Sequence, residues 1–248
     1  MASKFAIVTG SSRGIGASVA RMLVAHRWFV VGVARSAAAV RHESYRHIPC
    51  DLADPSALGK LRADITPLLT APDVRRVGVV NNAALIGHLG RTSDFELADL
   101  IAVQTANTAA PTMLMAMVSK LCKPDIAVRI VNVSSGVATQ AFPGMAAYST
   151  SKAALRMGGM ILAKEWESEV PGAHRDDAAI LSYEPGIVDT GMQTDARSRS
   201  QKDFPWVKMF TDFYERGALV PAERPAVEIV EFLESDKQPH FSERRLRS

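Results

Sequence analysis

The chain has 248 residues, enough for one large domain of helices and strands with a sizeable buried core. Hydrophobic residues make up 47% of it and charged residues 22%, and no apolar run is long enough to span a membrane. The formal charge is only +3, and no basic stripe interleaved with aromatic residues is present. We therefore expect neither a nucleic-acid partner nor a membrane partner.

The cysteines and the first residues of the chain bear on its location. Cys50 and Cys122 form neither a disulfide framework nor a metal-ligand cluster, which suits a reducing cytosol. The chain starts on an apolar, strand-like run, without the basic region and cleavage site of a secretory signal. We predict a cytoplasmic protein without a metal site.

Short, β-branched runs alternate with helical patterns along most of the chain. Nearly continuous apolar runs of this length are typical of strands buried on both faces of a parallel sheet. The predicted strands are 4–9, 28–34, 46–50, 76–81, 128–133 and 178–183. The predicted helices are 15–27, 55–69, 94–121 and 148–169. This alternation predicts a single α/β domain over 1–248, with a Rossmann-type, doubly wound parallel sheet.

The first predicted strand runs into a glycine-rich loop, TGSSRGIG, and then into the first predicted helix. Glycines let the backbone turn tightly and approach a pyrophosphate, while the helix N-terminus offers unpaired N–H donors and a partial positive charge. Because ligands of such sheets bind beyond the carboxyl ends of the strands, we predict a dinucleotide site here. The residues that would contribute are Gly10, Ser12, Arg13, Gly14, Ile15 and Gly16.

The end of the second predicted strand indicates which dinucleotide binds. A carboxylate about 20 residues beyond the glycines would bind a ribose 2′-hydroxyl and favour NAD. The sequence there is GVARS, which has Arg35 and no acidic residue. Arg35 and Arg13 can both face a 2′-phosphate, a group that arginine binds well, so we predict NADP(H) as the cofactor.

Small and polar residues follow the later strands, again at the carboxyl ends. Tyr148 and Lys152 are four residues apart on a predicted helix and therefore share one face, where a phenol beside an ammonium is a plausible acid/base pair. This spacing alone is common by chance, but Ser135 stands 13 residues before Tyr148. The other segments at strand ends are NNAAL at 81–85, NVSSG at 132–136 and PGIVDTGMQ at 185–193.

In this order the motifs resemble those of the short-chain dehydrogenase/reductases, in their single-domain branch of about 250 residues. The pattern is T-G-x-x-x-G-x-G, N-N-A-G, S-x(12)-Y-x-x-x-K and P-G-x-x-x-T, and the resemblance covers nearly the whole chain. Ala84 replaces the last glycine of N-N-A-G, and the end of the chain lacks the usual glycine-rich stretch, so we expect the last strand to be short or frayed. The second half is similar to benzil reductase and sepiapterin reductase-like members, which use NADPH to reduce one carbonyl of a vicinal dicarbonyl or α-hydroxyketone.

The resemblance implies a role for each catalytic residue. Tyr148 would be the general acid that protonates the carbonyl oxygen as hydride reaches the carbon. A free tyrosine has a pKa near 10, so work near neutrality requires its pKa to fall to about 7, helped by the Lys152 ammonium and the nicotinamide charge. Lys152 would also hold the nicotinamide ribose. Ser135 would orient the carbonyl oxygen, and Asn107 would hold a water that links Lys152 to solvent.

The resemblance also assigns the remaining cofactor contacts. Asp51 and Leu52 would flank the adenine, and Asn82 and Ala83 would line the adenosine ribose. The nicotinamide carboxamide would lie among Pro185, Gly186, Val188 and Thr190.

The predicted function is an NADPH-dependent carbonyl reductase that acts on an aromatic or vicinal dicarbonyl compound. An NAD-linked alcohol dehydrogenase of the same family is the alternative enzyme, disfavoured by the missing acid after the second strand. A nucleotide-sugar epimerase normally needs a larger C-terminal region. A non-catalytic NADP-sensing protein would be favoured by loss of Ser135, Tyr148 or Lys152, and all three are present.

Two further expectations concern the surface. In segment 192–216, aromatic residues recur at three- and four-residue spacing, which predicts an apolar helical face that is either core or a lid over an aromatic substrate. These residues are Trp206, Phe210, Phe213 and Tyr214. The family commonly pairs the helices that correspond to 94–121 and 148–166 across a two-fold axis, so we expect a homodimer rather than a tetramer.

Overall fold

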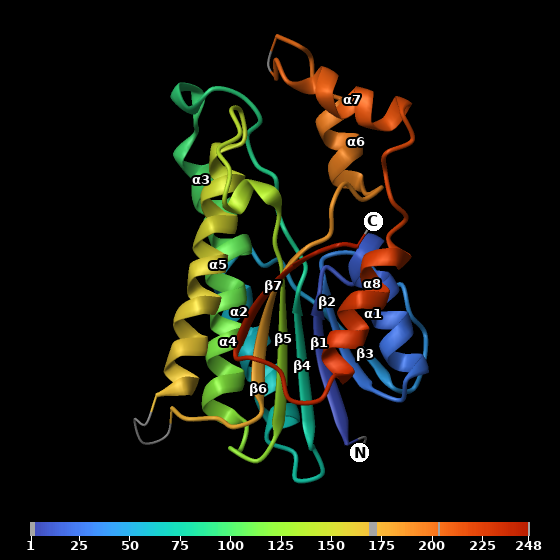
Figure 1. Ribbon diagram of the computed structural model, residues 1–248, viewed down its shortest axis with the longest axis vertical. Coiled ribbons are helices and arrows are strands. Elements are labelled where there is room, and N and C mark those ends of the chain that lie inside the picture. Colours follow the sequence, from blue (N-terminus) through green and yellow to red (C-terminus); the bar gives the residue numbers. More distant parts are fainter. Residues whose placement is uncertain (1–2, 169–172, 203, 248) are drawn as a thin grey trace.

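The structure, a computed structural model, describes residues 3–168, 173–202 and 204–247. Its centre is a seven-stranded parallel sheet in the order β3-β2-β1-β4-β5-β6-β7 (Figure 1). The strands are β1 (Lys4–Thr9), β2 (Phe29–Ala34), β3 (Tyr45–Pro49), β4 (Arg76–Asn81), β5 (Ala127–Val133), β6 (Ala178–Glu184) and β7 (Phe241–Arg245). The strand order reverses between β1 and β4, and such a switch point opens a crevice for a ligand at the carboxyl ends.

Helices cover both faces of this sheet, which confirms the predicted doubly wound α/β fold (Figure 1). Packed on one face are α2 (Pro55–Leu69), α4 (Ala110–Leu121) and α5 (Ala146–Glu167), and on the other α1 (Gly14–Ala25) and α8 (Glu223–Glu234). Successive residues of a strand point to opposite faces, so Val79 joins the first layer and Val80 the second. Strands buried on both sides explain why their sequences are apolar without alternation.

The predicted helix 94–121 is present as one helical run, but it begins at Leu97 and is not an α-helix throughout. The structure has a 3-10 turn at Thr92–Asp94, then α3 (Leu97–Gln104), a π-helical turn at Thr105–Ala109, and α4. A π turn accommodates an extra residue and often marks a functional position. Here the turn contains Asn107, whose fully buried side chain bonds to another part of the chain.

The last part of the chain also departs from expectation. Helix α8 was not predicted, and α5 ends at Glu167, while position 169 lies outside the described residues. Strand β7 is short, but it pairs with β6 over five positions, from Ile180↔Phe241 to Glu184↔Arg245. The expectation of a short or frayed last strand is therefore confirmed as a short, fully paired strand, and the end of β7 lies at the same edge of the sheet as the predicted site.

Two short helices, α6 (Gly191–Arg197) and α7 (Val207–Glu215), project beyond the carboxyl ends of the strands (Figure 1). Phe210 is buried, but Tyr214 is 58% exposed and packs on the Arg197 guanidinium, 4.4 Å from its ring centre. The expectation of one apolar face through Tyr214 is wrong, because Trp206 precedes the helix and Tyr214 turns to the outside.

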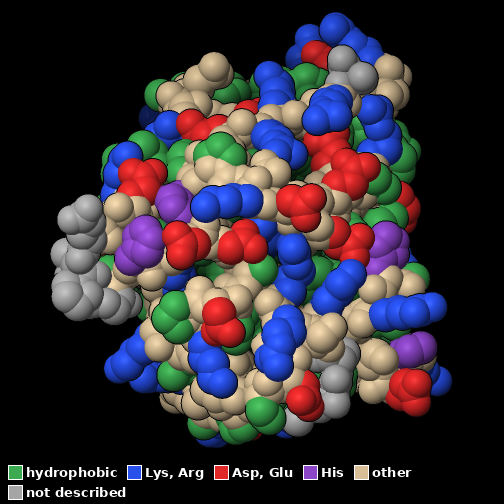
Figure 2. Space-filling view, turned by 60° about the horizontal axis from the view of Figure 1, so that its bottom comes forward, with side chains coloured by type: hydrophobic (Ala, Val, Ile, Leu, Met, Phe, Trp, Pro, Cys, Tyr) green, Lys and Arg blue, Asp and Glu red, His purple; other side chains and the backbone are tan. Residues whose placement is uncertain are grey.

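Across the described residues, no helix combines the length and the apolar character needed to cross a membrane. Figure 2 shows acidic and basic side chains interspersed over the face of the molecule that it displays.

Candidate active site

A cavity of about 1010 Å³ lies at the carboxyl ends of the strands. It brings together residues that lie far apart in the sequence, from the glycine loop to the start of α6. Of the predicted cofactor and catalytic residues, only Gly16 and Asn107 are not on its wall. The predicted residues that line it are Gly10, Ser12, Arg13, Gly14, Ile15, Arg35, Asp51, Leu52, Asn82, Ala83, Ser135, Tyr148, Lys152, Pro185, Gly186, Val188 and Thr190.

The glycine loop has the geometry of a phosphate cradle. Gly10 adopts a φ of +67°, and a Cβ added to it would lie 2.7 Å from the Asn82 Nδ2. A Cβ on Gly16 would collide with the Gly10 carbonyl oxygen. The Asn82 amide braces the loop by donating to the carbonyl oxygens of Thr9 (2.9 Å) and Gly10 (3.3 Å). No side chain caps the start of α1, so its N–H groups are available to a pyrophosphate.

The two arginines predicted to face a 2′-phosphate have different neighbours. Arg35 follows β2, and its Nη1 lies 3.9 Å from the Asp51 carboxylate, with both side chains largely exposed. Arg13 instead reaches toward the beginning of α6, where a Cβ added to Gly191 would lie 3.1 Å from the guanidinium carbon. Of the two arginines, Arg35 is therefore the main reason to predict NADP(H) as the cofactor.

Tyr148, Ser135 and Lys152 meet on the cavity wall. The Ser135 side chain lies beside the Tyr148 phenol, and the Lys152 Nζ lies 5.5 Å from the centre of the tyrosine ring. The Lys152 ammonium donates to the Val133 carbonyl oxygen at 2.6 Å. Ser134 lines the cavity too, but Ser135 is the serine whose side chain acts on the pKa of the Tyr148 phenol.

Burial is the main cause of the pKa shifts of Tyr148 and Lys152. It raises the pKa of Tyr148 to about 12, and the Ser135 hydrogen bond only partly offsets the rise. It lowers the pKa of Lys152 to about 8. The protein's own groups therefore do not lower the pKa of Tyr148, and the predicted fall to about 7, which includes the charge of the nicotinamide, stays a prediction. A phenol that keeps its proton at neutral pH is suited to donate it, which is the direction that carbonyl reduction requires.

The low pKa of Lys152 predicts the pH dependence of cofactor capture. Below about pH 8 the ammonium is charged and can bind ribose hydroxyls, whereas above it the charge is lost. We expect kcat/KM for NADPH, measured at a saturating carbonyl substrate, to fall roughly tenfold per pH unit above that value. A Lys152→Arg variant, whose guanidinium stays charged, should lose this decline even if its rate is lower. A flat wild-type profile to about pH 10 would contradict the assignment.

Asn107 lies behind the cavity wall and acts as a brace. Its Nδ2 donates to the Leu85 carbonyl oxygen (2.8 Å) and to the Ser151 hydroxyl (3.0 Å), and its Oδ1 accepts from the Leu85 N–H (2.8 Å). Both side-chain N–H groups are thus used within the protein. A water on this side chain would have to donate to Oδ1, so the predicted relay through Asn107 stays a prediction.

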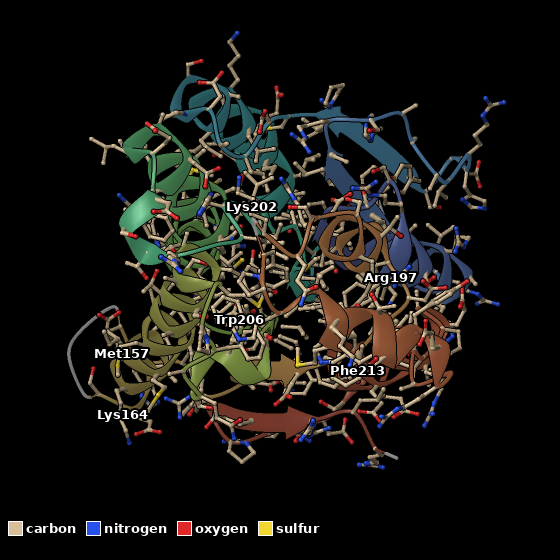
Figure 3. All side chains as sticks on the ribbon, turned by 90° about the horizontal axis from the view of Figure 1, so that it is seen from above. Met157, Lys164, Arg197, Lys202, Trp206 and Phe213 are labelled. Carbon is tan, nitrogen blue, oxygen red and sulfur yellow. The ribbon has the colours of Figure 1, made fainter. Side chains whose placement is uncertain are left out.

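One part of the cavity wall is apolar and was only partly anticipated. Phe204, Phe210, Met145 and Tyr148 form a buried cluster, and Trp206 packs on Phe142 with the ring centres 6.3 Å apart. Figure 3 shows Trp206 and Phe213 at this end of the molecule. Sequence periodicity pointed to the aromatic residues of 192–216 but not to the loop side chains that meet them. Other wall residues that the sequence analysis did not single out include Leu85, Ile86, Val137, Phe142, Met145, Glu184, Met192, Gln193, Met209 and Arg245.

The fold and this set of residues agree with the comparison to known proteins. The sequence profile of the family described as short chain dehydrogenase matches residues 4–201, so the chain belongs to the short-chain dehydrogenase/reductases. It is therefore an oxidoreductase of a family that acts on carbonyl or CH–OH groups with NAD(P)(H).

Individual relatives are more distant. The chain is 27% identical over 245 residues to a benzil reductase ((S)-benzoin forming) from Bacillus cereus, covering 95% of this chain and 96% of that protein. It is 28% identical over 250 residues to the sepiapterin reductase of Bos taurus, covering 93% and 90%. The crystal structure of the KRED1-Pglu enzyme has the same fold, with a TM-score of 0.79, 24% identity, and coverage of 96% and 100%.

Proposed function

We propose that the protein is an NADPH-dependent carbonyl reductase whose substrates are aromatic ketones, in particular compounds with two neighbouring carbonyl groups. The observation that carries this proposal is the union of the Ser135–Tyr148–Lys152 set with an apolar, aromatic wall in one cavity. The names of its relatives, benzil reductase and sepiapterin reductase, support the same class of substrate.

The residues of the cavity suit NADPH. The glycine loop and the uncapped start of α1 would hold the pyrophosphate, and Arg35 would bind the 2′-phosphate in the place where NAD enzymes carry an acid. Pro185, Gly186 and Val188 would line the nicotinamide. The cofactor supplies the hydride, and the protein supplies orientation and the proton.

The protein's own groups then account for the proton transfer. Ser135 donates a hydrogen bond to the substrate carbonyl oxygen and fixes it beside the Tyr148 phenol. The phenol gives its proton to that oxygen as negative charge develops there. The nearby Lys152 ammonium stabilises the resulting phenolate, an interaction that is strong because both groups are buried.

The described residues of the segment 192–216 would cover the substrate. In this proposal the side chains of Met192, Phe210 and Phe213 bind the substrate's aromatic ring, and they help to exclude water from the site of proton transfer. Ser135 and Tyr148 would hold the carbonyl of the same substrate.

The test is a panel of benzil, other aromatic diketones, simple aromatic ketones and pterins with a neighbouring carbonyl side chain. NADPH oxidation is followed by absorbance at saturating cofactor. We expect the aromatic diketones to have the highest kcat/KM. No turnover of any carbonyl compound by folded protein that binds NADPH would favour the NADP-sensing alternative.

We also propose that the protein is a homodimer. Apolar side chains stand exposed on α3 and on the outer face of α5, where Figure 3 labels Met157. The exposed residues are Leu97, Ile101, Met157 and Ile161. Burial of such side chains stabilises association. Light scattering at micromolar concentration should give twice the chain mass, and Ile161→Glu should give a folded monomer. A monomeric wild-type protein would contradict this expectation.

A further inference from the structure

A carboxylate stands on the cavity wall close to the catalytic serine, where the proposed reaction needs none. Glu184 is the last residue of β6, directly before Pro185, and its side chain lines the cavity with 29% of its surface exposed. Its Oε1 lies 3.1 Å from the position that a Cβ on Gly136 would take. Gly136 follows Ser135, so the carboxylate lies next to the segment that would orient the substrate carbonyl.

Glu184 is held in place by the end of β7. Arg245 is its direct neighbour in the sheet, and the Arg245 Nε lies 3.4 Å from Glu184 Oε1. The N–H of Leu246 donates to the Glu184 carbonyl oxygen at 2.8 Å. The following residue, Arg247, is tied to α8, because its N–H donates to the Glu228 carboxylate at 3.2 Å. The position of Glu184 is therefore set by paired backbone and not by a loose surface loop.

The pair with Arg245 leaves Glu184 able to bind a ligand. A carboxylate offers about four lone-pair positions and, when ionised, only accepts hydrogen bonds. The Arg245 side chain is 74% exposed, and its Nε approaches one of the two carboxylate oxygens, Oε1, at 3.4 Å. Gly136, which lies beside the carboxylate, has no side chain to compete for those lone pairs, and the next wall residue, Val137, is apolar.

We propose that Glu184 is a specificity-determining residue, an inference that rests on the proposed function. Its carboxylate would accept a hydrogen bond from a hydroxyl or amino group next to the substrate's reacting carbonyl. The chemistry distinguishes two similar substrates. The hydroxyl of an α-hydroxyketone would donate a strong, charge-assisted bond to the carboxylate. The second carbonyl of a diketone has only lone pairs at that position and would gain no such bond. A site that binds a donor in this way discriminates strongly against the analogue that lacks it.

The experiment compares benzil with benzoin, which share one skeleton and differ only in a carbonyl or a hydroxyl beside the reacting group. Initial rates are measured at saturating NADPH for the wild type and for Glu184→Gln, which keeps the shape and removes the charge. Glu243→Gln is the matched control, because Glu243 lies on the adjacent strand in an exposed pair with Arg156 (2.6 Å). We expect the ratio of kcat/KM for benzoin to that for benzil to fall at least tenfold in Glu184→Gln and to stay unchanged in the control.

A second variant tests the same point if Glu184→Gln does not fold. Arg245→Gln removes the guanidinium that competes for the carboxylate, so the ratio should rise at least threefold. An unchanged ratio in either folded variant, or an equal loss with both compounds, would overturn the role of Glu184 while leaving the reductase assignment intact. Failure of the wild-type protein to reduce either compound, or any other carbonyl compound, would overturn the proposed function and this inference with it.

Discussion

Tyr148→Phe is expected to lower turnover at least 10²-fold, the lower end of what a positioned general acid contributes. The change removes one hydroxyl from a buried ring, so the fold and the binding of NADPH should be nearly intact. The phenol that burial keeps protonated is then lost from the site. The measurement is kcat with the best diketone, together with thermal unfolding and a calorimetric titration of NADPH.

Lys152→Ala separates the two roles of the lysine and serves as the comparison. Turnover should fall about as far as in Tyr148→Phe, but NADPH should also bind more weakly, because the ammonium serves both the phenol and the ribose. If the pair were only a structural contact on a helix, each change would cost under about 0.5 kcal/mol of stability and leave turnover alone. Normal turnover in folded Tyr148→Phe protein would end the catalytic assignment.

The second large effect concerns the choice of cofactor. We expect NADPH to bind at least tenfold more tightly than NADH, a difference of about 1.4 kcal/mol. Arg35→Asp should abolish or reverse this preference, because the 2′-phosphate would then meet the introduced carboxylate beside Asp51, which already lies 3.9 Å from Arg35. The measurement is the dissociation constant of each cofactor for both proteins.

An exposed arginine on α2 provides the control. Arg62→Asp makes the same change of charge at a position that does not line the cavity, so its effect on the NADPH-to-NADH ratio should be small. Equal affinity of the wild type for the two cofactors, or a preference for NADH, would instead favour the NAD-linked dehydrogenase.

The sheet could be predicted because each strand has its own local signal. The six predicted strands lie within one residue of the observed ones, since apolar β-branched runs in a two-sided sheet need no partner to be recognised. The glycine loop could be predicted for the same reason, because its motif is one continuous stretch of the sequence. The amphipathic helix α8 also had a local pattern, with Ile229, Val230 and Leu233 buried on one side, and it was missed.

What remained out of reach depends on contacts between distant segments. The π turn around Asn107 forms against Leu85 and Ser151, and the sequence of the helix alone carries no sign of the extra residue. Glu184 is an ordinary acidic residue in the sequence. It becomes a candidate for substrate binding only because β5, β6 and β7 are neighbours and bring Gly136 and Arg245 to it.

The position of Trp206 gives the protein an internal optical probe. The chain has three tryptophans, and Trp28 and Trp166 are fully buried, in the two helical layers on opposite faces of the sheet. Trp206 alone lies in the segment over the cavity, against Phe142 and Phe204. A shift in the emission maximum when a non-reducible substrate analogue is added therefore reports on this segment, over a constant background from the other two indoles. Movement of residues 191–216 is thus observable in the unmodified chain, without an attached dye.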